Sequence, residues 1–430
     1  MRRGKEPYSR NSEGAGVSMK CRVIAVLGTR PEAIKLALVI QELRRRSDEF
    51  DIAVIHTGQH RTMLDSALKL FKIKPDFDLD VMRPNQTLSS LTARVLDTVE
   101  NACSRFQPHM VLVQGDTTTA FASALAAYYC KIAVGHIEAG LRSRDIYNPF
   151  PEEANRRLVS VMTEIHFAPT ALSRDNLLAE GVASEKIVVT GNTVVDTLRA
   201  LSQTPHSWDH TALAGIPQNT GRLVLVTSHR RESWGTDQEQ MCLALKDLVA
   251  KHRDIRIVYP VHMNPNVRST VNALLQDTER IHLTEPLDYI TFVSLLRHSF
   301  LVLTDSGGIQ EEAPTFGKPV LVLRKVTERP EASQFGMAKI IGMSRGAIVR
   351  EADRLLTDTD AYQDMSEGEN PYGDGHSSER IVEAVARWSQ TKTPLLEADK
   401  EFKLPPRLHP RRRRSDFSQD AAKAATAGKE

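Results

Sequence analysis

Residues 304–320, TDSGGIQEEAPTFGKPV, contain the pattern that decides the fold of this chain. The apolar segment before them, FLVLT at residues 300–304, predicts a buried strand, and the residues after the glycines predict a helix. A turn from a strand into a helix leaves backbone N–H groups unbonded at the helix start, where the helix dipole also favours an anion such as phosphate. Gly307 and Gly308 let a ligand approach the backbone closely, and Ser306 adds a hydroxyl donor.

Two glutamates follow this turn. Glu311 and Glu312 lie one turn into the predicted helix, where a carboxylate can accept hydrogen bonds from ribose hydroxyls. The pattern is also that of an ordinary strand-to-helix turn whose acidic residues complement the dipole. For an isolated SGG the ordinary interpretation is the better one, so the rest of the chain must favour a nucleotide site before the turn can be assigned to one.

The composition is that of a globular protein without a strong overall charge. Lys and Arg total 56 and Asp and Glu total 54, so the net charge of +2 does not favour a nucleic-acid partner. Four widely spaced cysteines, without a CxxC motif, argue against a zinc site and fit a reducing compartment. No apolar run approaches the roughly 18 residues of a membrane helix, and the N-terminus lacks the apolar core of a secretory signal. We therefore expect a cytoplasmic protein with no membrane span and no metal site.

Predicted strands and helices alternate in two similar halves of the chain. The alternation runs through residues 21–201 and restarts in residues 221–372, which predicts in each half a parallel sheet with helices on both faces. Outside these halves we predict a linker, a closing helix and two disordered tails, at residues 202–220, 373–390, 1–20 and 391–430. The expected fold is therefore α/β, with two doubly wound, Rossmann-like domains facing a central cleft.

Polar side chains recur where the predicted strands end. In doubly wound sheets, functional residues lie just beyond the carboxyl ends of the strands. Such positions are occupied in both halves by Arg30, Lys35, Gln59, Asp116, Glu138, His229, His262 and Ser306. One polar residue at a strand end is ordinary, whereas a set of them in two halves indicates a single cleft between the domains.

Cations and carboxylates both fall in this predicted cleft. Arg30 and Lys35 bracket a helix start, where cations are unfavourable unless an anion binds, and the HRR segment at 229–231 adds a second basic group suited to a diphosphate. Asp116, Glu138 and Glu152 would oppose an anion and so need another role. General acid–base catalysis is one such role, because buried carboxylates hold raised pKa values.

A structural role for each of these carboxylates stays open. Each fits a helix cap or a salt bridge with Arg142 or Arg156, and Asp116 is followed by a threonine run typical of a helix start.

The motifs around these residues resemble those of the non-hydrolysing UDP-N-acetylglucosamine 2-epimerase family, in order from about residue 21 to residue 388. The matching segments are GTRPEAIK at 28–35, QH at 59–60, GDT at 115–117, HIEAGLR at 136–142, PEEANR at 151–156, HRRE at 229–232, DSGGIQEEAP at 305–314, TERPE at 327–331 and NPYGDG at 370–375. The resemblance implies domains of the glycosyltransferase-B type, a homodimer, no metal and no bound nicotinamide. It also implies reversible interconversion of UDP-GlcNAc and UDP-ManNAc, which supplies ManNAc-type sugars for cell-surface polysaccharides.

The resemblance further implies a mechanism and a set of site residues. UDP leaves by anti elimination to give 2-acetamidoglucal and then adds again with inverted configuration at carbon 2. The implied catalytic residues are Asp116, Glu138, Glu152 and His229. The implied substrate-binding residues are Arg30, Lys35, Arg156, Ser306, Gly307, Gly308 and Glu312. Some members bind a second UDP-GlcNAc as an activator, for which the candidate residues here are Gln59, His60, Arg230 and His262.

Three other functions stay open on the sequence. A retaining sugar-nucleotide glycosyltransferase would share the SGG and EE elements, but it would need an acceptor site and would not need three carboxylates in the first domain. A silent nucleotide-sugar sensor would gain nothing from buried like charges. A hydrolysing epimerase would release free ManNAc, and nothing in the chain resembles the sugar kinase fused to that enzyme in animals.

Overall fold

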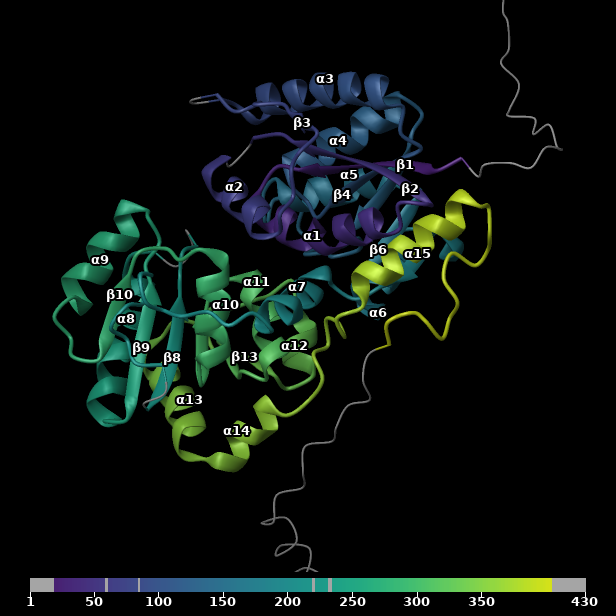
Figure 1. Ribbon diagram of the computed structural model, residues 1–430. Coiled ribbons are helices and arrows are strands. Elements are labelled where there is room, and N and C mark those ends of the chain that lie inside the picture. The colour runs from purple at the N-terminus through teal and green to yellow at the C-terminus, as the bar shows by residue number, and fades with distance from the viewer. Residues whose placement is uncertain (1–18, 59–60, 84–85, 219–220, 231–233, 404–430) are drawn as a thin grey trace, which may run out of the picture.

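The computed structural model describes residues 19–58, 61–83, 86–218, 221–230 and 234–403 and shows two α/β domains on either side of a cleft (Figure 1). Residues 1–18 and 404–430, which belong to the predicted tails, lie outside the described residues. Among the described helices, none combines the length and the hydropathy that a membrane span requires.

The first domain is built on a parallel seven-stranded sheet in the order β3-β2-β1-β4-β5-β6-β7. Its strands are β1 (Cys21–Leu27), β2 (Phe50–His56), β3 (Phe77–Asp78), β4 (Met110–Gln114), β5 (Ala133–Ile137), β6 (Ile165–Ala168) and β7 (Ile187–Val189). Its helices are α1 (Arg30–Arg45), α2 (Arg61–Leu70), α3 (Leu88–Phe106), α4 (Thr118–Tyr129), α5 (Glu152–Met162), α6 (Ala171–Ala179), the 3₁₀ helix η1 (Ser184–Lys186) and α7 (Thr193–Ser202). The strand order reverses between β1 and β4, which is where doubly wound domains bind ligands.

The second domain repeats this plan with six parallel strands in the order β10-β9-β8-β11-β12-β13. Its strands are β8 (Arg222–Thr227), β9 (Ile255–Pro260), β10 (Ile281–Thr284), β11 (Leu301–Thr304), β12 (Val320–Val322) and β13 (Ala338–Ile340). Its helices are α8 (Thr236–Lys251), α9 (Pro265–Leu275), α10 (Tyr289–His298), α11 (Gly307–Glu312), the 3₁₀ helix η3 (Ala313–Phe316), α12 (Pro330–Gln334), α13 (Arg345–Thr357) and α14 (Thr359–Ser366). The corresponding reversal lies between β8 and β11. The predicted pair of Rossmann-like domains is confirmed.

The first sheet is covered on both faces because its central strand carries apolar side chains on both. Along β1, Val23, Ala25 and Leu27 pack into one apolar cluster, whereas Ile24 and Val26 pack into another on the opposite face. Successive side chains of a strand point to opposite faces, so a continuous apolar strand requires helices on both sides.

Residues 304–320 form two short helices after β11, where the sequence predicted a single helix after the glycines. The α-helix α11 follows Ser306 directly and passes at Ala313 into the 3₁₀ helix η3. Pro314 lies in this second helix, and a proline has no N–H to continue an α-helical hydrogen-bond ladder.

The last helix, α15 (Ser377–Ser389), returns to the first domain and packs beside α1 (Figure 1). Its start donates from the Ser378 N–H to Asp196 of α7 at 2.7 Å. Residues 391–403, which the prediction placed in a disordered tail, lie against the fold: Leu396 and Phe402 are buried, and the Phe402 N–H donates to the Val189 carbonyl at 2.8 Å. Ordered structure thus extends beyond the predicted boundary, because Leu396 and Phe402 anchor a stretch that is otherwise mostly polar.

Candidate active site

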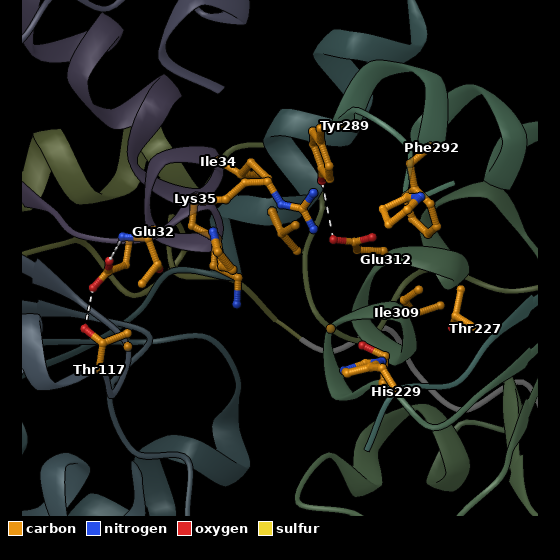
Figure 2. A pocket seen from close by; sticks show the side chains of 18 of the residues that line it. Glu32, Ile34, Lys35, Thr117, Thr227, His229, Tyr289, Phe292, Ile309 and Glu312 are labelled. Atoms are coloured by element: carbon orange, nitrogen blue, oxygen red, sulfur yellow. Dashed lines mark hydrogen bonds between the residues drawn. The ribbon is translucent and has the colours of Figure 1, made fainter. Parts of the chain in front are cut away.

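The two reversal points face each other across one cleft of about 440 Å³ (Figure 2). Its walls come from the loops after β1 and β4 in the first domain and from the loops after β8 and β11 in the second. Of the predicted site residues, the cleft is lined by Arg30, Lys35, Asp116, Glu138, His229, His262, Ser306, Gly308 and Glu312. Glu152, Arg156, Gly307 and Arg230 are not part of the lining, and Gln59 and His60 lie outside the described residues.

Glu32 fixes the first loop and is a residue that the sequence analysis did not assign. Its carboxylate is 1% exposed and accepts from the N–H groups of Gly28 at 2.8 Å and Thr29 at 2.5 Å. Its other oxygen accepts from the Thr117 hydroxyl at 2.6 Å, after β4 (Figure 2). Glu32 therefore ties together the two loops that carry Arg30 and Asp116.

Glu138 and Lys35 form a buried ion pair at the inner end of the cleft. Lys35 Nζ lies 2.6 and 2.7 Å from the two oxygens of Glu138, and Gln114 donates to the same carboxylate. Glu138 follows β5 with φ of 66°, a left-handed conformation that costs a non-glycine residue about 1–3 kcal/mol and is concentrated at functional sites. Burial raises the pKa of Glu138 even though Lys35 lowers it. A raised pKa suits a carboxylate that exchanges protons.

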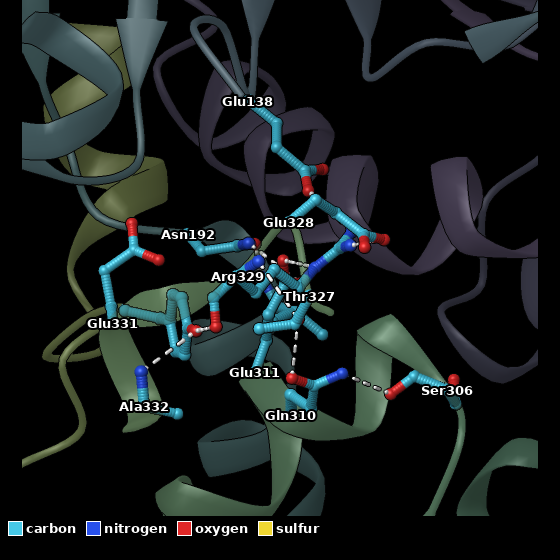
Figure 3. A network of polar contacts seen from close by, with 12 residues as sticks. Glu138, Asn192, Ser306, Gln310, Glu311, Thr327, Glu328, Arg329, Glu331 and Ala332 are labelled. Carbon is cyan, nitrogen blue, oxygen red and sulfur yellow. Dashed lines mark hydrogen bonds and ion pairs between the residues drawn. The ribbon is translucent and has the colours of Figure 1, made fainter. Parts of the chain in front are cut away.

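Arg329 and Glu311 of the second domain extend this ion pair into a network (Figure 3). Arg329 lies immediately before α12, and its guanidinium bonds Glu311 at 2.5 Å and Glu328 at 2.6 Å and comes within 4.0 Å of Glu138. Arg329 and Glu328 lie in the TERPE motif, but no role was assigned to either from the sequence. Gly307 is needed here for space, because a Cβ on it would lie 2.5 Å from Arg329.

Asp116 lies in the cleft wall and pairs with Arg156, 2.7 Å away, which in turn bonds Glu153 at 2.9 Å. The salt-bridge alternative is thus observed for Asp116. The cap alternative is wrong, because the Thr117 side chain caps α4 instead, by accepting from the Ala120 N–H. Arg156 therefore holds Asp116 at the cleft.

Glu152 begins α5 and is partly buried. Burial raises its pKa, the charge of Asp116 adds to that effect, and Arg156 and Arg230 oppose it. The charge environment of Glu152 therefore includes residues of both domains, although its side chain is not part of the cleft lining.

His229 is oriented by Asp305, the first residue of the motif at 305–314, to which no role was assigned from the sequence. Asp305 is fully buried and accepts from the N–H groups of His229 and Arg230, both at 3.0 Å, and from the Ser228 hydroxyl at 2.9 Å. His229 Nδ1 lies 3.3 Å from the same carboxylate, and its ring stacks on His262 with centroids 5.8 Å apart. Burial lowers the pKa of His229, which favours the neutral imidazole.

The second-domain wall of the cleft also carries Glu312 and Tyr289, whose side chains meet at 3.4 Å (Figure 2). Burial raises the pKa of Glu312 to about 7. Ser306, which also lines the cleft, directly precedes α11, and its N–H donates to the Thr304 hydroxyl at 2.9 Å. Glu312, which can accept hydrogen bonds, and the start of α11, whose N–H groups can donate them, thus lie on the same wall.

No group of three or more His, Cys, Asp or Glu side chains is arranged to hold a metal ion within the described ranges. The cleft itself brings carboxylates, imidazoles and cations close together.

The comparison with known proteins assigns the chain to a family. The family model described as UDP-N-acetylglucosamine 2-epimerase matches residues 41–386. The chain belongs to the UDP-N-acetylglucosamine 2-epimerase family. The resemblance drawn from the motifs is thereby confirmed.

Relatives of this epimerase family match nearly the whole chain. The "Probable UDP-N-acetylglucosamine 2-epimerase" of Ralstonia nicotianae is 51% identical over 370 residues, covering 85% of this chain and 98% of the relative. The UDP-N-acetylglucosamine 2-epimerase of Escherichia coli strain K12 is 49% identical over 369 residues, again with 85% and 98% covered. The crystal structure of the Neisseria meningitidis epimerase bound to UDP-GlcNAc has a TM-score of 0.80 at 45% identity and covers 85% of this chain and 100% of that chain. This similarity confirms the expected glycosyltransferase-B type of architecture.

Proposed function

We propose that this protein interconverts UDP-GlcNAc and its carbon-2 epimer, UDP-ManNAc. The observation that carries the proposal is the inner end of the cleft, where a carboxylate with a raised pKa, Glu138, meets the cations Lys35 and Arg329. A reaction that removes a proton while a diphosphate departs needs both kinds of group in one place. The names of the relatives and the UDP-GlcNAc bound to the Neisseria meningitidis enzyme support the same substrate.

The proposed chemistry is elimination followed by addition. A carboxylate takes the proton from carbon 2, the C–H electrons form the double bond to carbon 1, and the bond from carbon 1 to the UDP oxygen breaks toward UDP. Return of UDP to carbon 1 and of a proton to the other face of carbon 2 gives the epimer. Cations stabilise the charge that develops on the leaving diphosphate, and a closed cleft keeps water from the intermediate.

Within this scheme the predicted residues keep their proposed roles. Glu138, Asp116 and Glu152 are the candidate acid–base groups, with His229 beside the diphosphate. Ser306, Gly307 and Gly308 would hold the phosphates, Glu312 the ribose, and Arg30, Lys35 and Arg156 the anionic parts of the ligand. Family membership favours this reaction over the glycosyltransferase and the silent sensor.

Conversion of the purified substrates tests the proposal. Incubation with either UDP-GlcNAc or UDP-ManNAc should give the same mixture of the two, separable by chromatography. Release of free ManNAc and UDP would assign the hydrolysing reaction instead, and an unchanged substrate in both directions would contradict the proposal.

We also propose a second copy of the chain and a second UDP-GlcNAc as partners. For the homodimer, the support is an exposed apolar face on α4 and α5, where Tyr128, Tyr129 and Val161 are 59%, 60% and 86% exposed. The mass of the protein in solution tests this proposal.

For the activator, the support is that His262 stacks on His229 and that Arg230 lies 3.4 Å from Glu328. A rise of the initial rate with added UDP-GlcNAc, measured from UDP-ManNAc, would reveal activation. Cytoplasmic location and the supply of cell-surface polysaccharide belong to the same proposal.

Replacing Arg30 by Ala should weaken UDP binding roughly ten- to a hundredfold, because hydrogen bonds to charged groups contribute about 1.5–3 kcal/mol. Arg30 lines the cleft at the start of α1, and its charge acts on Tyr289 and Glu312. Calorimetric titration with UDP measures the change. Arg45→Ala, at the exposed end of the same helix, is the matched control. An unchanged dissociation constant in Arg30→Ala would remove this residue from the anion site.

UDP binding should weaken as the pH falls below 7, by up to roughly tenfold between pH 8 and pH 6 beyond any effect of the phosphate itself. Ribose hydroxyls donate best to the ionised form of Glu312, whose pKa burial raises to about 7, so binding below that pH must release a proton. Glu312→Gln cannot titrate and isolates this part of the pH dependence, since the UDP phosphate titrates equally in both proteins. Equal pH dependence in the two proteins would exclude Glu312 from the ribose site.

A further inference from the structure

Lys35 is shared between two buried carboxylates that come from different domains. Its Nζ lies 2.6 Å from Glu138 of the first domain and 3.2 Å from Glu311 of the second. The two carboxylate side chains are 6% and 1% exposed. One ammonium group therefore serves two carboxylates in a place where water cannot compensate either of them.

Glu311 differs from Glu138 in that it lies behind the cleft wall and its oxygens are occupied by donors. One oxygen accepts from Arg329 at 2.5 Å, and the other accepts from Lys35 and, at 3.1 Å, from the Asn192 amide (Figure 3). Glu138 instead lines the cleft, where a substrate can reach it. Glu311 is thus built to stay ionised and to act on its neighbours rather than on a ligand.

We propose that Glu311 is a positioning residue for the epimerisation: by holding a share of Lys35, it prevents the ammonium from pairing with Glu138 alone and leaves Glu138 free to take up and release the carbon-2 proton. This inference rests on the proposed function and assigns to it a residue that does not touch the substrate.

The electrostatics of the network agree with this division. Burial and the charge of Glu311 raise the pKa of Glu138, against Lys35 and Arg329. Burial also acts to raise the pKa of Glu311, but Arg329 and Lys35 outweigh it and lower that pKa. Two carboxylates whose environments push their pKa values apart are a common arrangement for acid–base catalysis, in which one stays charged while the other exchanges protons.

The arrangement is complete only when the two domains meet. Lys35, Glu138 and Asn192 belong to the first domain, whereas Glu311 and Arg329 belong to the second. If the domains separated, Lys35 would lose Glu311 and pair with Glu138 alone. The basicity of Glu138 is therefore coupled to the approach of the domains.

Several other charged or titratable groups lie close enough to Glu138 and Glu311 to affect their pKa values. The charged or titratable groups that act on Glu138 and Glu311 or are acted on by them are Lys35, Arg329, Glu312, Glu331 and Tyr372. None of them is substituted in the variants below, so a shift in the pH dependence of kcat originates from the change at Glu311 or at its donor.

The test is the pH dependence of kcat for epimerisation by Glu311→Gln, Glu311→Asp and the wild type. Without the charge at Glu311, Lys35 would pair with Glu138 alone and lower its pKa. The acid limb of the profile of kcat against pH should therefore move about one unit to lower pH in Glu311→Gln. The plateau kcat should fall by less than about tenfold, because a weaker base works more slowly. The KM should change little. Glu311→Asp keeps the charge and should keep the limb near its wild-type position.

Two further variants make the test independent of folding. Glu351→Gln removes another buried, cation-paired glutamate of the same domain, remote from the cleft, and should leave the limb in place. Asn192→Ser keeps a side-chain oxygen to cap α7 but removes the amide donor from Glu311. Glu311 should then attract Lys35 more strongly, so the acid limb should move to higher pH, opposite in direction to the shift in Glu311→Gln.

The outcomes separate this inference from the proposed function. A wild-type protein that does not epimerise contradicts the function itself. An active wild type whose acid limb stays in place in both Glu311→Gln and Asn192→Ser contradicts the role of Glu311, whatever those changes do to stability.

Discussion

Replacing Glu138 by Gln should leave UDP binding intact and reduce turnover by roughly a hundred- to ten-thousandfold, the usual contribution of a general acid or base. Glutamine keeps the shape of the side chain and can still accept a hydrogen bond from Lys35, which lies 2.6 Å from the carboxylate. It cannot take a proton from carbon 2. The chemical step is therefore lost, while Arg30 and the residues proposed to hold the phosphates and the ribose are unchanged.

Two measurements on this variant check the expectation: the UDP dissociation constant by calorimetry and the rate of conversion of UDP-GlcNAc. Glu180→Gln is the matched control, because Glu180 also pairs with a buried cation, Arg142, at 2.7 Å but away from the cleft. It should convert the substrate like the wild type. Turnover near the wild-type rate in Glu138→Gln would remove this residue from the catalytic set.

Replacing Arg329 by Met should destabilise the protein by about 3–5 kcal/mol, the typical effect of removing one partner from a buried ion pair. Arg329 holds Glu311 at 2.5 Å and Glu328 at 2.6 Å, so its loss leaves two buried carboxylates short of a cation. In domains of this size the change corresponds to a fall in the thermal midpoint of roughly 6–20 °C. A midpoint is the appropriate measure, because two domains need not unfold in one step.

Arg345→Met is the control for this prediction. Its ion pair with Asp247, at 2.6 Å, is exposed, and solvent screens such pairs, so the midpoint should stay close to that of the wild type. If Arg329→Met had the same thermal midpoint as Arg345→Met, the network would not hold the domains as described.

Much of the fold follows from local sequence patterns. The alternation of apolar strands and amphipathic helices predicted both Rossmann-like domains, and the closing helix begins and ends in the region predicted for it. The positions of polar residues at strand ends predicted the cleft, since the carboxyl ends of parallel strands meet at one edge. Arg30, Lys35, Glu138 and His229 indeed line it.

What the sequence did not predict are the partners that act across the cleft. Lys35 and Glu311 are 276 positions apart, and no spacing rule connects residues so distant in the chain. Glu311 and Glu312 look equivalent in the sequence, yet one faces Arg329 behind the wall and the other faces Tyr289 in the cleft. Burial and direction, which only the packed domains define, distinguish them. The catalytic and binding roles of the site residues remain predictions.

The most direct test of the account is a proton NMR time course of the wild-type protein with UDP-GlcNAc in deuterated water. We expect UDP-ManNAc to appear with deuterium at carbon 2, because the proton removed from that carbon exchanges with solvent before another is returned. Substrate that stays unchanged and undeuterated would contradict proton transfer at carbon 2 and with it the proposed function.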